Sequence, residues 1–578
     1  MTLMSEKIKK NFNQNKEIFF IVALGVFLIF FRLNRADTLN DGSHYSMRAL
    51  AYLDYIGPNL QTAPIQWFGS VPWWGNLSFH DAPPLVFLIQ HIFFKIFGEN
   101  IIALRLPFAL SGVGVLIFVY LIAKKLFGKQ TAVLSSLALA VSTFFLWSFR
   151  TAYLEGVETF FIAGAVYFFL KSLEKEKFWI HTGIFLALAL LSKYTSFFLI
   201  PFMLIYTFIR HKQTFIQKKF WIGVSIFFLL ILPVIVYNIM MYKARGHFDV
   251  QVSKLFPSMF EAAKKDWPIL FSSTDNTISP FSNYIAIWRQ LQGYHTFMFG
   301  ILLIFSVIFV FVNWLIGMRR KMDSHRHFIP ILLLSFSVIF ISLPPATRYL
   351  PILMPLVSVA IGFSLSNLFE AFTGKRNIQK VLVIIFSVIF FIELAFSINT
   401  NLISHPRNEK PKFYSSTGEK SMGFNQLEDY LKTTWKENPL YIPYVRKPKN
   451  TNDLMFYWNN LKDNNLYIFD GDMDWFGRIW YFNRFFNYHK INFTSESEIE
   501  TMVGLDKDLF DILRKVVGVH YVYYITIADN SMKHKTEYAN LLEKNFLHNI
   551  DTLHNGEKVQ IVNDYGENAF IVYKLRLN

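Results

Sequence analysis

Long runs of apolar residues recur along the chain as far as residue 398 and are separated by short polar stretches. Several runs reach or exceed the ~18 residues that indicate a transmembrane helix. We expect spans at 17–33, 105–125, 131–149, 156–173, 178–191, 195–209, 220–242, 297–317, 328–343, 349–369 and 381–398. The pattern therefore predicts a polytopic α-helical membrane protein with about eleven spans.

One apolar run, at residues 85–97, is short and is interrupted by His91 and Lys95. We expect it to lie at the membrane interface without crossing. This interpretation puts every basic short loop on the inner side, in agreement with the positive-inside rule. Those basic loops are 124–129, 171–177, 210–219, 319–327 and 375–380. The basic N-terminal segment precedes a run without a small-residue cleavage site, which predicts a retained signal-anchor helix.

The same topology leaves three larger segments on the outer, extracytoplasmic side. They are a first outer loop at 34–84, a second at 243–296, and a tail at 399–578. The tail is richer in polar residues and alternates strand-like with helix-like runs. We therefore predict two domains: a transmembrane module at 1–398 and a small extracytoplasmic α/β domain at 399–578.

The composition supports a membrane protein and excludes several kinds of site. The 578 residues are 53% hydrophobic and 17% charged, with no cysteine. Disulfides, thiolate catalysis and cysteine-ligated metals are therefore excluded. The net charge of +16 lies largely in the short basic loops, where it sets orientation, so nucleic acid is not an expected partner.

Charged residues at the outer ends of the spans form the candidate site. The acids are Asp41 and Asp81 of the first outer loop and Glu155 before the span at 156–173; the cations are Arg105, Arg150, Lys193 and Arg348. Arginine and lysine at a membrane surface suit a phosphate headgroup. A nearby carboxylate suits deprotonation of an acceptor hydroxyl. A divalent cation is a candidate cofactor, with Asp81, His80 and His247 as candidate ligands.

Each residue also has a plainer explanation. Asp41 stands in Asn-Asp-Gly, a sequence typical of turns and helix N-caps, and Asp81 precedes Ala-Pro-Pro, which is typical of a turn. Glu155 suits the N-terminus of the following helix. The arginines and Lys193 suit a membrane interface, where such side chains extend toward water. The histidines suit a solvated loop.

The segments that carry these residues resemble a known family. DGSHYSMRAL, FHDAPPLVFLIQHIFFKIFG and ALRLPFALSGVGVLIFVYLIAKKLFG, followed by RTAYLEGVETFFIAGAVYFFL, ALLSKYTSFFLIP and TRYLPILMPLVSVAIGF, are similar to the C-type membrane glycosyltransferases. The resemblance is to the dolichyl-phosphate-mannose protein mannosyltransferases and the lipid A aminoarabinose transferases. It covers residues 34–369, with the motifs in family order.

The resemblance implies transfer of a sugar from a polyprenyl-phosphate donor to a hydroxyl acceptor (protein, lipid or glycan), with inversion, on the extracytoplasmic face of the cell membrane. It maps the family's acids onto Asp41, Asp81 and Glu155 and its RLP arginine onto Arg105. Lys193 and Arg348 fall where the family has basic residues at outer helix ends. Asp41 is the expected general base. The chain departs from the family at Gly42, where many relatives have a second acid, and at Ala82, where the aminoarabinose transferases have lysine.

Two other functions are compatible with a polytopic membrane protein: a transporter or flippase for a lipid-linked glycan, and a non-catalytic scaffold. Transporters place ionisable residues near the bilayer midplane. The predicted spans carry few such residues, and this favours the transferase.

Overall fold

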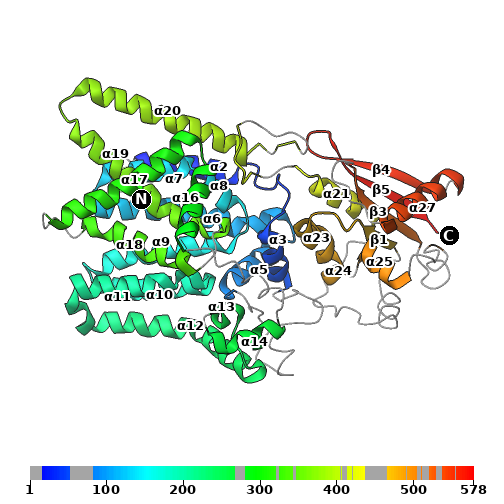
Figure 1. Cartoon of the computed structure of the whole chain (residues 1–578), viewed down its shortest axis with the longest axis horizontal. Coiled ribbons are helices and arrows are strands. Elements are labelled where there is room, and N and C mark those ends of the chain that lie inside the picture. Colours follow the sequence, from blue (N-terminus) through cyan, green and yellow to red (C-terminus); the bar gives the residue numbers. More distant parts are fainter. Residues whose placement is uncertain are drawn as a thin grey trace, which may run out of the picture. The chain divides into compact units, whose positions relative to one another are not determined.

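The computed structural model describes residues 16–51, 82–254, 256–266, 280–319, 325–342, 346–403, 405–406, 413–418, 421–435, 465–489, 491–503, 510, 520–528, 537–553 and 555–577. The chain divides into two compact units (Figure 1). The helical unit comprises Met1–Leu33, Tyr52–Ile403 and Lys412–Gly418, and the sheet unit comprises Asn34–Ala51, Ser404–Pro411 and Glu419–Asn578.

The helical unit follows the predicted series of apolar runs. Its elements are α2 (Lys16–Phe30), α5 (Leu85–Phe97), α6 (Ile101–Phe127), α7 (Lys129–Val141), α8 (Thr143–Arg150), α9 (Leu154–Ser172), α10 (Phe178–Ser192), η2 (Tyr194–Phe198), α11 (Leu199–Arg210), η3 (Lys212–Ile216), α12 (Lys218–Arg245), α13 (Val250–Ser253), α14 (Pro257–Asp266), α16 (Pro280–Gly293), α17 (Phe297–Arg319), α18 (His325–Ser342), η4 (Thr347–Tyr349), η5 (Pro351–Leu353), α19 (Met354–Ala371) and α20 (Arg376–Asn401). Each predicted span thus corresponds to a helix or a helix pair.

Within the described ranges, five helices are long and apolar enough to cross a membrane. They are Ile101–Phe127, Lys218–Arg245, Phe297–Met318, Thr347–Ala371 and Arg376–Asn401. A bent pair, α7 with α8, makes six if it counts as one span. The figure of eleven stays a prediction, because several of the other apolar helices are shorter than the ~20 residues that span a bilayer without help.

The predicted span at 131–149 consists of two helices, α7 and α8, with a break between them. The chain bends by 63° between α7 and α8. Ser142 has an extended backbone there, and its Oγ accepts a hydrogen bond from the Phe145 N–H at 3.2 Å, so it caps a new helix. The bend is also fixed from α20, because Glu393 Oε1 accepts from both the N–H (3.1 Å) and the Oγ1 (2.7 Å) of Thr143.

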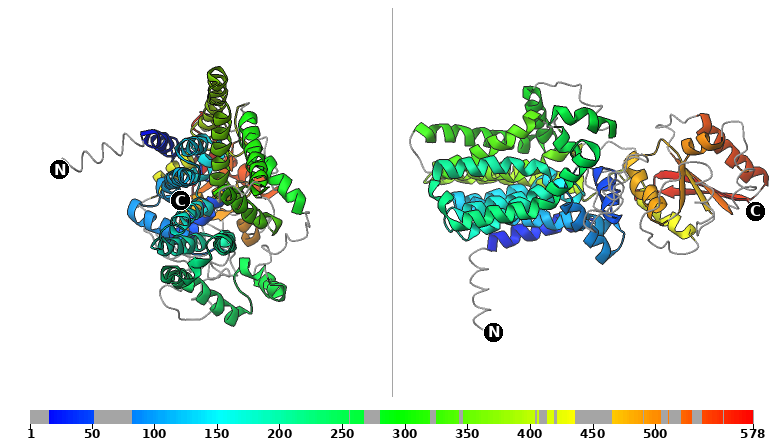
Figure 2. Two further views of the ribbon diagram at one scale, coloured as in Figure 1. Left: turned by 90° about the vertical axis from the view of Figure 1, so that its left-hand side faces the viewer. Right: turned by 90° about the horizontal axis from the view of Figure 1, so that it is seen from below.

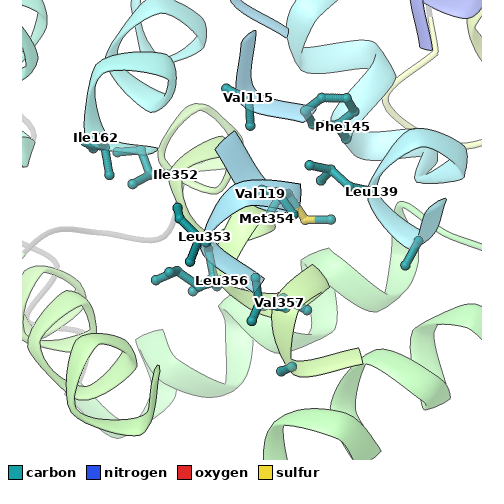
Figure 3. Packing of buried hydrophobic residues seen from close by; sticks show 14 of the residues in the cluster. Val115, Val119, Leu139, Phe145, Ile162, Ile352, Leu353, Met354, Leu356 and Val357 are labelled. Carbon is teal, nitrogen blue, oxygen red and sulfur yellow. The ribbon is translucent and has the colours of Figure 1, made fainter. Parts of the chain in front are cut away.

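The core of the helical unit forms where α6, α7, α8 and α9 surround the segment η5–α19 (Figure 3). Val119, Leu139, Leu353 and Val357 are among the side chains buried there. The chain enters this core as a 3-10 turn, Pro351–Leu353, directly after η4. The core therefore fixes the position of η4 beside the start of α9.

Helices α10 and α12 run side by side (Figures 1 and 2), and their backbones approach closely at two glycines. A Cβ added to Gly183 would collide with the backbone of Gly223, and one added to Gly223 would collide with the backbone of Trp179. Small residues permit such close approach between helices in membrane proteins. This contact sets the position of α10, which ends at Ser192.

The sheet unit holds a five-stranded mixed sheet in the order β2-β1-β3-β5-β4. Its elements are α3 (Asp41–Ala51), α21 (Phe424–Thr434), β1 (Asn465–Phe469), α23 (Trp475–Arg478), η6 (Ile479–Asn483), α24 (Arg484–His489), β2 (Asn492–Ser495), α25 (Glu496–Val503), β3 (Tyr521–Ile527), α27 (Glu537–Leu553), β4 (Gly556–Val562) and β5 (Asn568–Arg576). β1 pairs in parallel with β2 and β3, whereas β5 is antiparallel to β3 and β4.

Successive strand residues point to opposite sides of the sheet, so each strand presents side chains to both faces. Both faces are covered by other elements. On one face Leu466 and Ile468 pack in a cluster with Phe546 of α27. On the other face Phe469 stacks on Phe482 of η6, with ring centroids 4.8 Å apart. The central strand β1 is accordingly buried along its whole length.

The division of the chain differs from the predicted boundary in two respects. The expected tail begins at residue 399, but the residues up to Ile403 and the segment Lys412–Gly418 belong to the helical unit, and the expected first outer loop is divided between the units. Residues Asn34–Ala51, expected to be part of the transmembrane module as the start of its first outer loop, belong to the sheet unit. The Asp37 carboxylate provides the main reason, because it accepts backbone hydrogen bonds at the start of α21. A buried carboxylate with such partners cannot be recognised from the sequence.

Candidate functional site

A buried ion pair lies at the start of α9. Lys193 Nζ contacts Glu155 Oε1, and the exposed fraction of the side chain is 12% for Lys193 and 0% for Glu155. Glu155 occupies the first turn of α9, and Lys193 follows the last residue of α10. The structure thus brings together two residues that the sequence predicted for the site.

A second carboxylate lies one turn further along α9. Glu158 is fully buried, and its Oε1 accepts hydrogen bonds from Thr195 Oγ1 at 2.6 Å and Ser196 Oγ at 2.7 Å. Residues three apart on a helix share a face, so Glu155 and Glu158 both face the segment 193–196. Sequence analysis missed Glu158, although an acid inside an apolar helix is itself a signal of function.

Tyr349 connects Lys193 with a third predicted residue. Lys193 Nζ lies 4.6 Å from the centre of the Tyr349 ring, and Arg348 Cζ lies 5.3 Å from the same centre. Cations are attracted to the faces of aromatic rings, most strongly when both are shielded from water. We call Glu155, Glu158, Lys193, Thr195, Ser196, Arg348 and Tyr349 the Glu155 cluster.

Two buried carboxylate oxygens of the Glu155 cluster can accept further hydrogen bonds. Among the residues that the structure describes, Oε2 of Glu155 and Oε2 of Glu158 have no hydrogen-bond partner. Buried polar atoms without partners are uncommon, and each calls for an explanation such as a bound group or a catalytic role. The Glu155 carboxylate can hold Lys193 in place for an anionic ligand, and Arg348 lies over the same aromatic ring as Lys193.

Arg105 and Arg150 lie together elsewhere, at the C-terminal end of α2. Arg150 donates to the backbone oxygens of Leu28, Ile29, Phe31 and Arg32 at 2.8–3.2 Å. Arg105 donates to the Leu33 oxygen at 2.8 Å. Leu28 and Ile29 lie in the last turn of α2, and the other three residues follow it directly, so the two arginines satisfy backbone oxygens at and just after the helix terminus.

Asp41 lies in the sheet unit as the first residue of α3. The turn before α3 is closed by Asn40, whose Oδ1 accepts from the Gly42 N–H at 2.8 Å. The sequence offered this turn role for Asp41, and in the structure the side chain of Asn40 has it. The other two residues predicted from the first outer loop, His80 and Asp81, lie outside the described residues.

His247 lies in the second predicted outer loop and is buried. Its Nδ1 is 2.6 Å from the Phe248 oxygen and its Nε2 is 3.0 Å from Asp266 Oδ2. A metal at His247 would have to replace one of these contacts. No group of three His, Cys, Asp or Glu side chains that could hold a metal occurs in the described ranges. A metal site stays a prediction.

A further network in this loop was also missed. Asp249 Oδ2 accepts from Tyr194 Oη at 2.7 Å and from Asn238 Nδ2 at 2.9 Å, and its Oδ1 caps α13 at Val252 N. Burial raises the pKa of Asp249 above its usual value, although these hydrogen bonds oppose the shift. The network ties the residue after Lys193 to the loop.

Part of the chain that carries this arrangement is similar to known proteins. Residues 81–237 match the family model of the dolichyl-phosphate-mannose-protein mannosyltransferases. The matched segment includes Arg105, Glu155, Glu158 and Lys193. The predicted resemblance to this kind of glycosyltransferase is thereby confirmed for a segment that carries a large part of the site.

Two relatives align with parts of the chain. An uncharacterized protein of Aquifex aeolicus (strain VF5) is 33% identical over 156 residues, which are 26% of this chain and 31% of that protein. The putative mannosyltransferase YkcB of Bacillus subtilis (strain 168) is 34% identical over 97 residues, 17% of this chain and 14% of that one. The chain thus spans less than a third of the length of each relative.

Among solved structures, the oligosaccharyltransferase of Archaeoglobus fulgidus, determined in complex with Zn and sulfate, has a TM-score of 0.51. The match covers 96% of this chain and 72% of that one at 13% identity. This likeness shows a shared fold, so the predicted membrane glycosyltransferase fold is confirmed. ArnT of Cupriavidus metallidurans scores 0.49 over 96% of this chain and 97% of its own, again at 13% identity. That score is too low to support a conclusion.

Proposed function

We propose that the protein transfers a sugar from a polyprenyl-phosphate donor to a hydroxyl acceptor, on the extracytoplasmic face of the cell membrane, with inversion at the anomeric carbon. The observation that carries the proposal is the Glu155 cluster. Two cations, Lys193 and Arg348, lie over one aromatic ring, and Lys193 also pairs with the buried carboxylate of Glu155. Both members of this pair lie within a segment that matches a mannosyltransferase family.

Lys193 and Arg348 bind the donor phosphate. Charge-assisted hydrogen bonds to phosphate are stronger than neutral ones, and their strength rises where water is excluded. Glu155 holds Lys193 in place before the donor binds, so the side chain does not lose rotamer freedom at that moment. Glu158 fixes the turn at Thr195 and Ser196, which follows Lys193 directly.

Arg105 and Arg150 have a different role in this proposal. Their guanidinium groups stabilise the end of α2, because they donate to carbonyls that would otherwise lack partners. A direct phosphate contact by either arginine stays a prediction, and it would require that some of these bonds be exchanged. The end of α2 leads directly into the segment that carries Asp41.

Asp41 is the proposed general base. The acceptor oxygen attacks the anomeric carbon while its proton passes to the Asp41 carboxylate. The bond between the anomeric carbon and the phosphate oxygen breaks, and the polyprenyl monophosphate leaves with the bonding electron pair. Neutralisation by Lys193 and Arg348 makes this leaving group a good one, so no strong general acid is needed. Asp81 and Glu155 position the acceptor or bind a divalent cation.

The family name suggests the chemistry of both substrates. Dolichyl-phosphate-mannose is a mannosyl phosphodiester of a polyprenol, and the acceptor in that family is a protein. We propose a mannose-like hexose on a polyprenyl phosphate as the donor. For the acceptor the proposal is a hydroxyl group of a protein, lipid or glycan.

The test uses the purified full chain in detergent with polyprenyl-phosphate mannose as the probe and a membrane extract as the acceptor source. Release of polyprenyl phosphate, followed by mass spectrometry, reports turnover whichever acceptor is used. We expect release by the wild type and at least a ~100-fold lower rate for Asp41→Asn, the usual contribution of a general base. Unchanged turnover in Asp41→Asn would exclude Asp41 as the base.

Transport of a lipid-linked glycan is the second candidate. One observation favours it: Glu158 and Glu393 are buried carboxylates within apolar helices, a feature of transporters that the sequence analysis overlooked. Both carboxylates, however, accept hydrogen bonds from threonine hydroxyls. Detergent micelles have no compartments, so sugar transfer in the assay above would exclude transport as the sole activity.

A further inference from the structure

The Asp37 carboxylate caps the start of a helix that lies far away in the sequence. Its Oδ2 accepts from the N–H groups of Met422 (2.8 Å), Gly423 (3.0 Å) and Phe424 (3.4 Å), and its Oδ1 accepts from Asn425 at 2.9 Å. The first N–H groups of a helix have no intrahelical partner. The residue before α21 is Gly423, which has no side chain to cap them. The carboxylate at position 37 therefore completes α21.

Tyr481 of η6 fixes the chain on the other side of Asp37. Its hydroxyl accepts from the Thr38 N–H at 3.2 Å and donates to Asn425 Oδ1 at 2.7 Å. Asn425 in turn donates from Nδ2 to the Arg35 oxygen at 3.0 Å. The backbone from residue 35 to residue 38 is thus held by hydrogen bonds to two elements of the sheet unit.

Helix α3 itself has partners in the sheet unit as well. The Tyr488 hydroxyl donates to the Met47 oxygen at 2.9 Å, and the His44 ring stacks on Trp475 with centroids 6.2 Å apart. His44 lies three residues after Asp41, so the two share a helix face. These contacts hold α3 along its length, whereas Asp37 and Tyr481 hold its entry.

From these contacts we infer that the sheet unit positions the proposed base: Asp37 and Tyr481 clamp the entry to α3 and thereby set the place of Asp41. This inference rests on the proposed function, in which Asp41 accepts the acceptor's proton. Asp37 and Tyr481 are positioning residues, because they act through α3. A base that is misplaced by about 1 Å can cost on the order of 100-fold in rate.

The first experiment compares two matched tyrosine variants of the full chain. Tyr481→Phe removes both clamp hydrogen bonds without changing the packing. Tyr573→Phe, the control, removes one hydrogen bond to Glu543 (2.9 Å) on the opposite side of the same sheet unit. We expect Tyr481→Phe to lower kcat about tenfold with the donor KM unchanged. Tyr573→Phe should leave both constants unchanged. Equal losses in the two variants would refute positioning.

The second experiment is a double-mutant cycle that combines Tyr481→Phe with Asp41→Asn. If the clamp acts through the base, Tyr481→Phe has no further effect on the residual rate of Asp41→Asn. A full tenfold loss in that background would overturn the inference. Hydrogen exchange of the α3 amides gives an independent reading: faster exchange is expected in Tyr481→Phe and not in Tyr573→Phe, and unchanged exchange would contradict the clamp. Normal turnover of Asp41→Asn would instead refute the proposed base and leave the exchange result as the test of the clamp.

Discussion

Lys193 Nζ lies over the ring of Tyr349, 4.6 Å from its centre, while the same ammonium pairs with Glu155. The ring belongs to η4, which is anchored in the core through η5, and the carboxylate belongs to α9. Three segments far apart in the sequence thus hold one buried cation. We expect its position to be sensitive to each of them.

Lys193→Met should both destabilise the helical unit and weaken donor binding. Loss of one partner leaves the Glu155 carboxylate buried without its cation, which costs on the order of 3–5 kcal/mol. Adding Glu155→Gln should restore much of the stability but not the donor affinity. Thermal unfolding in detergent and the KM for polyprenyl-phosphate mannose separate the two effects.

Lys129→Met is the matched control, because Lys129 pairs with Glu17 at 3.1 Å and both side chains are exposed, by 47% and 36%. Such exposed pairs are worth about 0–1 kcal/mol, so little change is expected. A Lys193→Met protein with normal donor KM would exclude Lys193 from phosphate binding.

Glu158→Gln and Glu158→Leu should differ in stability and in donor affinity. Glutamine retains an acceptor oxygen for Thr195 and Ser196, so we expect a loss of less than about 1.5 kcal/mol. Leucine leaves the hydroxyls of Thr195 and Ser196 without this acceptor, and a buried polar group without a partner costs roughly 1–3 kcal/mol. The leucine variant should unfold at lower temperature and lose donor affinity through displacement of Lys193. Similar behaviour of the two variants would show that the hydrogen bonds to Glu158 are unimportant.

The raised pKa of Asp37 predicts that the stability of the sheet unit depends on pH. Burial raises the pKa of Asp37 to about 6, against the opposing effect of four backbone hydrogen bonds. The folded state then holds this proton more tightly than the unfolded chain. Its contribution to stability is complete below the unfolded pKa of about 3.9 and is lost as pH rises through about 6.

The expected change is at most about 3 kcal/mol, since one pKa unit corresponds to ~1.4 kcal/mol. Hydrogen exchange of the α21 amides, corrected for intrinsic rates, measures the opening free energy between pH 4 and 7. Asp37→Asn should flatten this dependence. A slope that persists in the Asn variant would assign the titration to another group.

Gly183→Ala should separate α10 from α12. The new methyl group would meet the backbone of Gly223, which cannot move aside as a side chain can. Overpacking of this kind costs roughly 1–3 kcal/mol. Gly293→Ala is the control, because a Cβ at that position has no atom within 4 Å. A thermal shift in the first variant alone is expected; equal melting temperatures would contradict the close contact.

Sequence patterns predicted the helices well, because apolar runs of membrane length are a strong signal. They did not reveal the bend at Ser142, which depends on Glu393 from a helix that lies 250 positions away in the chain. They also singled out Glu155, Lys193 and Arg348 as candidates, because charged residues at helix ends follow from charge and topology. Glu158 was overlooked because its role depends on hydroxyls at Thr195 and Ser196, which carry no pattern of their own.

The attachment of residues 34–51 to the sheet unit has a consequence for biosynthesis. Asp37 leaves the ribosome 385 residues before its partner Met422. At ordinary rates of chain elongation that interval is roughly 20–80 s. During this time α3 lacks its partners in the sheet unit, and that unit can form only when the C-terminal strands have been made. Exchange of C-terminal domains between relatives should therefore succeed only if residues 34–51 are exchanged with them.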